Sequence, residues 1–171
     1  MIKPNYKKNW KNNILITIAI IVMSSITVTF SINGQSFSKA TTLETIRKSG
    51  FIANQLDDLG FTEGEELPPF DISNLNIQDK YAEKVVDLFY NMLTFLTTAD
   101  GDTFLKETIE VSNDYENEYI DKLFDKLPYA YYSHLINVAN FMDVPSIFKY
   151  LVSKFARIIR ARTQATQGAS A

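Results

Sequence analysis

Apolar and polar residues alternate over residues 26–32, and this period of two predicts a β-strand with one buried face. Asn33-Gly34 follows the alternation directly. This pair is a strong hairpin signal, because both central positions of the tight turn need a positive φ. The sequence therefore opens the fold with a hairpin whose return strand begins at residues 35–37.

Helical spacing of apolar residues replaces the alternation after the hairpin. Thr41 lies three residues before Glu44, which predicts a capping box at the start of a short helix. A second short helix is predicted over residues 51–59, with Leu59 among its core-facing residues. Gly60 is placed to end that helix, because glycine readily adopts the left-handed conformation of a helix C-terminus.

Two prolines introduce the middle of the chain. Pro68 and Pro69 favour an extended segment through residue 72, which we predict as an edge strand because proline cannot donate a ladder hydrogen bond. Residues 80–96 form a long amphipathic helix. Its predicted apolar stripe consists of Tyr81, Val85, Leu88, Phe89, Met92, Leu93 and Leu96.

An acidic segment separates this helix from the C-terminal part. Residues 97–118 carry seven acidic residues and a single lysine, which predicts a long solvated insertion. Leu105, Ile109 and Val111 leave local folding open. We assign no regular structure to this segment at this stage.

Three helices are predicted after the acidic segment, over residues 119–127, 129–142 and 143–159. Asp143 is predicted to cap the last helix and Pro145 to lie in its first turn, where proline is tolerated. Residues 163–171 form a small polar tail without an apolar anchor. The apolar positions of the last helix cover one broad face: Val144, Ile147, Phe148, Leu151, Val152, Phe155, Ile158 and Ile159.

The breadth of that face has two interpretations of equal weight. A helix in a single domain normally buries its apolar face in its own core. A partner protein could instead complete part of this surface. In either case, an early small sheet followed by stacked helices and an all-helical end predicts an α+β fold.

Charge and composition narrow the function classes. The chain has a net charge of −3, but the first 22 residues carry four lysines and no acid. The remainder has 13 basic and 20 acidic residues, and such an acidic body argues against nucleic-acid binding. The absence of cysteine excludes disulfides and thiolate metal sites.

The N-terminal segment, residues 1–22, has three open interpretations. Its basic start, short apolar run and following serines resemble the layout of a secretory signal. The β-branched run could also be a buried strand. Alternatively, Met23 is the true start and the segment is an upstream artefact. We expect no membrane association unless the segment is a real signal or anchor.

Candidate catalytic chemistry is absent from the pattern. His134 is the single histidine, so no two-histidine metal site exists, and we predict a partly buried helix residue instead of a base. No glycine-rich phosphate loop appears. Tyr131 and Tyr132 are adjacent and cannot both face one core, so one of them is expected at the surface. The sequence thus predicts a protein without enzyme activity, metal or cofactor.

A series of motifs in order gives the chain a resemblance to a known family. These motifs are the strand and turn of Ile26-Thr-Val28 and Gly34-Gln-Ser-Phe37, then Leu56-Asp-Asp-Leu-Gly60, Ile120-Asp121-Lys-Leu-Phe124 and Leu135-Ile-Asn-Val-Ala-Asn140-Phe141-Met-Asp143-Val144. Over about residues 24–162 the chain resembles the Skp (S-phase kinase-associated protein) adaptors. Those proteins bridge a cullin and F-box proteins in ubiquitin ligases.

The resemblance implies a BTB/POZ fold over residues 23–96, an acidic loop over 97–118 and a C-terminal helical region over 119–162. It implies that Asn140 and Phe141 contact the N-terminal region of a cullin. It also implies F-box contact at Val144, Ile147, Phe148, Leu151, Val152, Phe155, Ile158 and Ile159. A cytoplasmic or nuclear location follows from the same family.

Two departures from the family pattern affect these expectations. The element around Ile120 lacks the family's tryptophan, and the 171 residues hold no counterpart of two further helices that clasp the F-box. Cullin binding therefore transfers better than F-box binding. The alternative hypothesis is a self-associating BTB/POZ structural or decoy protein that has lost F-box binding.

Overall fold

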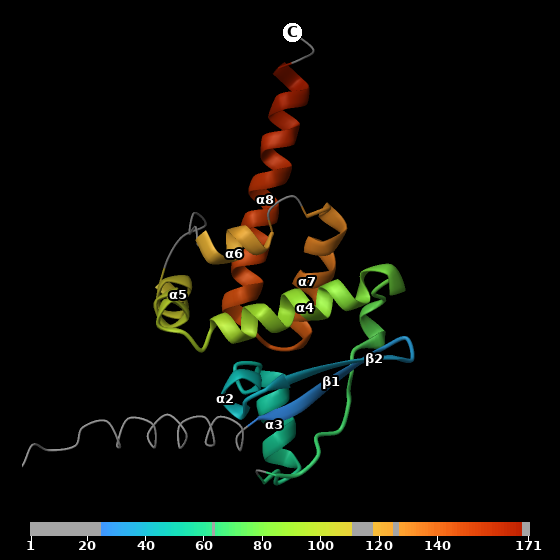
Figure 1. The fold of residues 1–171 in the computed structure, drawn as a ribbon. Coiled ribbons are helices and arrows are strands. Elements are labelled where there is room, and N and C mark those ends of the chain that lie inside the picture. The colour runs from blue at the N-terminus through green and yellow to red at the C-terminus, as the bar shows by residue number, and fades with distance from the viewer. Residues whose placement is uncertain (1–24, 63, 111–117, 125–126, 169–171) are drawn as a thin grey trace, which may run out of the picture.

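The computed structural model describes residues 25–62, 64–110, 118–124 and 127–168 (Figure 1). The three interpretations of residues 1–22 lie outside these ranges. The described chain is α+β, as predicted, with one small sheet and a larger helical part. The elements are β1 Ile26–Ile32, β2 Gln35–Thr41, α2 Leu43–Ile46, α3 Gly50–Asp58, β3 Phe70–Asp71, a 3-10 turn Ser73–Leu75, α4 Asp79–Phe95, α5 Ala99–Glu110, α6 Glu118–Leu123, α7 Tyr129–Phe141 and α8 Pro145–Gly168.

The sheet has the strand order β2-β1-β3. β1 and β2 are antiparallel, and the turn between them has φ of 51° at Asn33 and 81° at Gly34, so the predicted hairpin is confirmed. β3 pairs in parallel with β1, with Phe70 opposite Phe30. The extended segment after the two prolines is therefore an edge strand, as predicted.

The short helices after the hairpin differ from the prediction at their caps. The side chain of Thr42 accepts from the Thr45 N–H and caps α2, so the predicted capping box between Thr41 and Glu44 is wrong. Thr41 is instead the buried last residue of β2. Ser49, for which no role was predicted, caps α3, because its side chain accepts from the Ile52 N–H.

The end of α3 confirms one prediction and corrects another. Gly60 has φ of 63°, and its N–H donates to the carbonyl of Asp57 while the next N–H, of Phe61, donates to Leu56. This pair of bonds is the Schellman motif expected of a C-terminal glycine. Leu59 is 60% exposed and does not face the core, because the chain turns away at this point.

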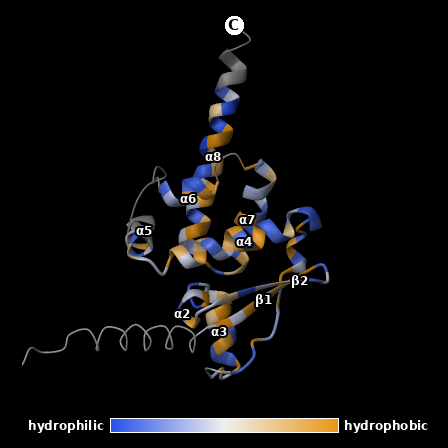
Figure 2. Ribbon diagram, viewed as in Figure 1, coloured by the Kyte–Doolittle hydropathy of each residue, from blue (hydrophilic) through white to orange (hydrophobic). Residues whose placement is uncertain are grey.

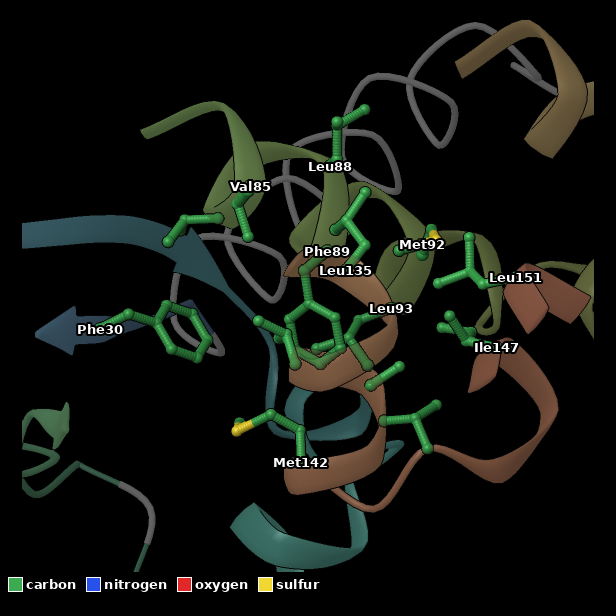
Figure 3. Close-up of a cluster of buried hydrophobic side chains, with 14 of the residues drawn as sticks. Phe30, Val85, Leu88, Phe89, Met92, Leu93, Leu135, Met142, Ile147 and Leu151 are labelled. Atoms are coloured by element: carbon green, nitrogen blue, oxygen red, sulfur yellow. The ribbon is translucent and has the colours of Figure 1, made fainter. Parts of the chain in front are cut away.

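α4 is the centre of the core. It lies between the sheet and the C-terminal helices (Figure 1). Phe89 meets Phe30 of β1 edge-on, with the ring centroids 6.3 Å apart. Figure 3 shows how its apolar side joins strand and helix residues in one cluster, which includes Phe30, Val85, Leu88, Phe89, Met92, Leu93, Leu135, Met142, Ile147 and Leu151. The predicted stripe of α4 is thus the wall shared by both parts of the protein.

Residues 97–118 are not wholly a solvated loop. Residues 99–110 form α5, and Phe104 is completely buried between Phe95 and Tyr150, with ring centroids 5.7 and 5.5 Å apart. The prediction is wrong for this helix, because one aromatic residue anchors it while acids such as Asp100 and Asp102 face solvent. Residues 111–117 lie outside the described residues.

α8 is longer than predicted. It continues to Gly168 and projects beyond the other helices (Figure 1), so the expected tail is wrong for residues 163–168. The residues beyond Ile159 include alanine, arginine and glutamine, which have good helix propensity, and the helix continues without an apolar anchor. Among the described helices, none combines the length and the hydrophobicity that a membrane span requires.

Candidate protein-binding surfaces

The corner between α7 and α8 is closed by backbone hydrogen bonds. Asp143 has φ of 51°, a left-handed conformation that aspartate tolerates better than most residues. Its N–H donates to the Asn140 carbonyl at 3.2 Å, and the Val144 N–H donates to Ala139 at 2.9 Å. Asp143 therefore ends α7 in a Schellman motif, and its predicted role as the cap of α8 is corrected.

The start of α3 lies directly on this corner. Ser49 Oγ donates to the Met142 carbonyl at 2.5 Å, and Gly50 N–H donates to the Asp143 carbonyl at 3.0 Å. A Cβ at Gly50 would lie 2.8 Å from Asp143 Cγ, so only glycine permits this approach without a shift. The corner is thus held in one geometry by a segment from the other end of the fold.

The two predicted cullin-contact residues lie at this corner. Asn140 is exposed. Phe141 is half-buried against Phe51, with the ring centroids 5.0 Å apart. The fold therefore brings an exposed amide side chain and a partly accessible aromatic ring together on a rigid support.

The eight predicted F-box-contact residues do not share one environment. Val144, Ile147 and Leu151 are buried in the protein's own core, so no partner reaches them in the folded chain. This corrects their assignment as contact residues. Phe148, Phe155 and Ile158 are partly buried, and Val152 and Ile159 are 40% and 48% exposed. The accessible apolar surface of α8 is therefore restricted to these five.

Four of these five residues form a stripe along α8, in which Val152 and Ile159 are exposed and the two phenylalanines partly buried. Phe148, Val152, Phe155 and Ile159 follow one another at spacings of four, three and four residues. Residues at these spacings lie on one side of an α-helix. We call these four residues the α8 stripe. Figure 2 shows apolar segments alternating with polar ones along the projecting part of α8.

Aromatic residues of α7 brace the base of the α8 stripe. The ring of Phe155 lies 5.9 Å from Tyr132, nearly parallel to it, and 6.2 Å from Tyr129. The guanidinium of Arg162 lies 3.6 Å from the centre of the Tyr129 ring, which is a cation–π contact. These contacts therefore support the helix beyond the core along the edge of the stripe that carries Phe155, and they leave Val152 exposed.

A half-buried carboxylate joins α6 to the same region. Asp121 accepts from the Tyr150 hydroxyl and pairs with the Lys154 ammonium. Burial raises the pKa of Tyr132 to about 12, and the nearby Asp121 and Tyr129 add to this shift. Tyr132 therefore stays neutral and acts as a packing group, not as a proton donor at ordinary pH.

His134 and the tyrosines fit their predicted roles. Tyr132 is buried and Tyr131 is partly exposed, so the two adjacent rings do face different surroundings. Tyr131 and His134 both contact Tyr81 of α4, at 5.1 and 5.3 Å between ring centroids. Burial lowers the pKa of His134. No cluster of metal-ligating side chains occurs in the described part of the chain.

None of the predictions above concerns the basic residues of α8. Two of them, Lys149 and Arg160, are exposed beside the α8 stripe. The signal was present as the complete absence of acidic residues between residues 145 and 168.

Comparison with protein-family models and with curated proteins finds no match to this sequence. Function is therefore inferred from the order of the motifs and from the two surfaces described above.

Proposed function

We propose that this protein is a non-catalytic adaptor of the Skp type, with a BTB/POZ fold, that links the N-terminal region of a cullin to F-box proteins. The order of elements supports this. The elements follow the order of the motifs that the chain shares with the Skp adaptors. They are a hairpin, a helix ended by Gly60, a short strand after two prolines, the long helix α4 and the α7–α8 corner.

The observation that carries the proposal is the surplus apolar surface of α8. Ile147 and Leu151 of α8 are buried in the core together with Val144, which precedes the helix. Val152 and Ile159 of α8 remain exposed. Apolar side chains at helical spacing on an exposed helix are the usual anchors of helix-mediated protein binding. The cullin surface is separate, since Asn140 and Phe141 lie at the opposite end of α7 from Tyr129, which contacts the middle of α8.

Calorimetry with the full chain tests the proposal. An F-box segment is titrated first and a cullin N-terminal region is added afterwards. The double variant Val152→Glu/Ile159→Glu should lose F-box binding and keep cullin binding, because it places two carboxylates in an apolar contact. Asn140→Arg should do the reverse. Glu83→Gln, on the exposed side of α4, is the control and should change neither affinity.

If the chain binds neither the F-box segment nor the cullin region, the adaptor function is refuted. Cullin binding without F-box binding would support the decoy alternative, in which the chain occupies a cullin without recruiting a receptor.

The alternative of self-association also makes use of the α8 stripe. Two exposed apolar residues on a projecting helix are compatible with pairing between copies. Sedimentation velocity distinguishes the two functions: a dimer of the full chain that Val152→Glu dissociates, and that is indifferent to cullin, favours the structural protein.

A further inference from the structure

Charge is unevenly divided between α8 and the rest of the chain. α8 carries five basic residues and no acidic residue. Residues 23–144, which precede it, carry eight basic and 20 acidic residues. A helix of one sign therefore projects from a body of the other sign, and such a separation creates a directed field at the helix surface.

The cations lie beside the α8 stripe. Successive residues of a helix are about 100° apart, which places Lys149 about 60° from Val152 and Arg160 about 100° from Ile159, on the same side. Both are exposed and form no salt bridge with another described residue, and they are separated by ~16 Å along the helix. Arg162 borders the stripe on its other side, over Tyr129. The apolar stripe is thus bordered by positive charge.

We infer that the α8 stripe binds an amphipathic helix of a partner protein whose apolar residues are flanked by acidic ones. The apolar side chains of that helix lie on Val152 and Ile159, and its carboxylates pair with Lys149 and Arg160. Val152 and Ile159 are two turns apart, which matches the i, i+3 or i+4, i+7 anchors of a partner helix. This inference rests on the proposed function only for the location of the surface, and it adds the charge of the partner.

Charge also disfavours two other occupants. If a second copy packed its α8 against this α8 through the stripe, the exposed Lys149 and Arg160 of one chain would approach the same two residues of the other. Like charges brought together in this way oppose association. An anionic membrane would attract α8, but it would repel the body with its 20 acidic residues. An acidic helix meets neither obstacle.

The probe for a test is a synthetic helical peptide of about 18 residues with leucines at i, i+3, i+4 and i+7 and flanking glutamates. A matched peptide has lysines in place of the glutamates. Fluorescence anisotropy with the full chain should show binding of the acidic peptide at least about tenfold tighter than the basic one. The affinity should fall as salt is raised, because the paired charges are solvent-exposed.

Variants locate the binding. Lys149→Glu/Arg160→Glu should reverse the preference between the two peptides, and Val152→Glu should abolish binding of both. Lys80→Glu/Lys84→Glu on α4 has the same change in charge and should leave the preference as it is. All four positions of these double variants are exposed, and circular dichroism confirms that each variant is folded.

Three results would overturn the inference. These are equal affinity for the two peptides, binding only to vesicles of equal parts phosphatidylcholine and phosphatidylserine, and a dimer that Lys149→Glu/Arg160→Glu strengthens while the acidic peptide fails to bind. An F-box segment is titrated in parallel, so that a failure of the inference about charge can be told apart from a failure of the proposed adaptor function. Binding of the acidic peptide without the F-box segment supports the inference and refutes the adaptor. If the F-box segment binds with an affinity that neither salt nor Lys149→Glu/Arg160→Glu changes, the adaptor is supported and the inference is refuted.

Discussion

The two halves of α8 both carry apolar residues at helical spacing, but their surroundings differ. Residues 145–151 lie in the core, where Ile147 and Leu151 are buried beneath α4 and α7. Residues 152–168 continue the same helix; α7 contacts them at Phe155 and Arg162 but leaves Val152 and Ile159 exposed. The comparison teaches that an apolar stripe at helical spacing predicts a packing contact, but does not tell whether the same chain or a partner protein makes it. Neighbouring elements decide whether the contact is internal.

The largest effect should separate the two halves directly. Leu151→Ala removes a completely buried side chain and should lower the free energy of unfolding by ~2–5 kcal/mol. Val152→Ala, one residue later, should change it by less than about 0.5 kcal/mol, since the side chain is 40% exposed and alanine favours the helix. Urea unfolding of both variants checks this, and equal losses would mean that the outer half is also core.

The next effect concerns the support of the inner half by α5. A Cβ at Gly101 would overlap the Phe95 carbonyl oxygen and lie 2.7 Å from Leu96 Cα, both of which are backbone. Gly101→Ala should therefore displace α5, and with it Phe104 from Tyr150, at a cost of ~1–3 kcal/mol in urea unfolding. Thr103→Ala, at an exposed position of the same helix, is the control and should be close to neutral.

A smaller effect is expected at the corner where the inner half begins. Ser49→Ala removes both the cap of α3 and the hydrogen bond to the Met142 carbonyl, which should cost ~1–2 kcal/mol. Thermal unfolding monitored by circular dichroism measures the loss. Ser36→Ala, exposed on β2, provides the comparison. A neutral Ser49 variant would show that the corner is stable without α3.

The smallest effect is a dependence on pH at the outer side of α7. Because burial lowers the pKa of His134 in the folded state, the unfolded chain binds its proton more readily. The contribution of His134 should be fully present above the unfolded pKa of about 6.5 and should be lost as pH falls through the folded pKa. NMR titration of the single histidine gives the folded pKa, and a value at or above 6.5 would contradict the prediction.

Local chemistry made part of this fold predictable. The positive φ of Asn33 and Gly34 and the end of α3 at Gly60 are imposed by residue type, so a short window of sequence reveals them. The stripe of α4 was equally clear, because seven apolar positions at one period leave little choice of buried face.

The errors at α5, at Leu59 and along α8 depended on the surroundings of each residue in the fold. Phe104 anchors α5 only because Phe95 and Tyr150 lie beside it in space. The many acidic residues around it predicted a solvated insertion instead. Leu59 has the spacing of a core residue, but the chain leaves the core at Gly60. The division of the eight predicted contact residues into buried, partly buried and exposed sets likewise follows from which of them the neighbouring helices cover. At the candidate site, sequence identified the helix and the corner, and only the packing identified which side chains a partner can reach.

The bond between Ser49 and Met142 joins residues 93 positions apart. Protein synthesis proceeds from the N-terminus, so the hairpin and α3 leave the ribosome well before the corner that docks on them. During that interval the apolar side of α4 that packs against α7 has no helix to cover it, and such exposed surfaces attract chaperones and promote aggregation. Completion of the fold therefore awaits the last third of the chain, and a non-local closure of this kind makes folding slow.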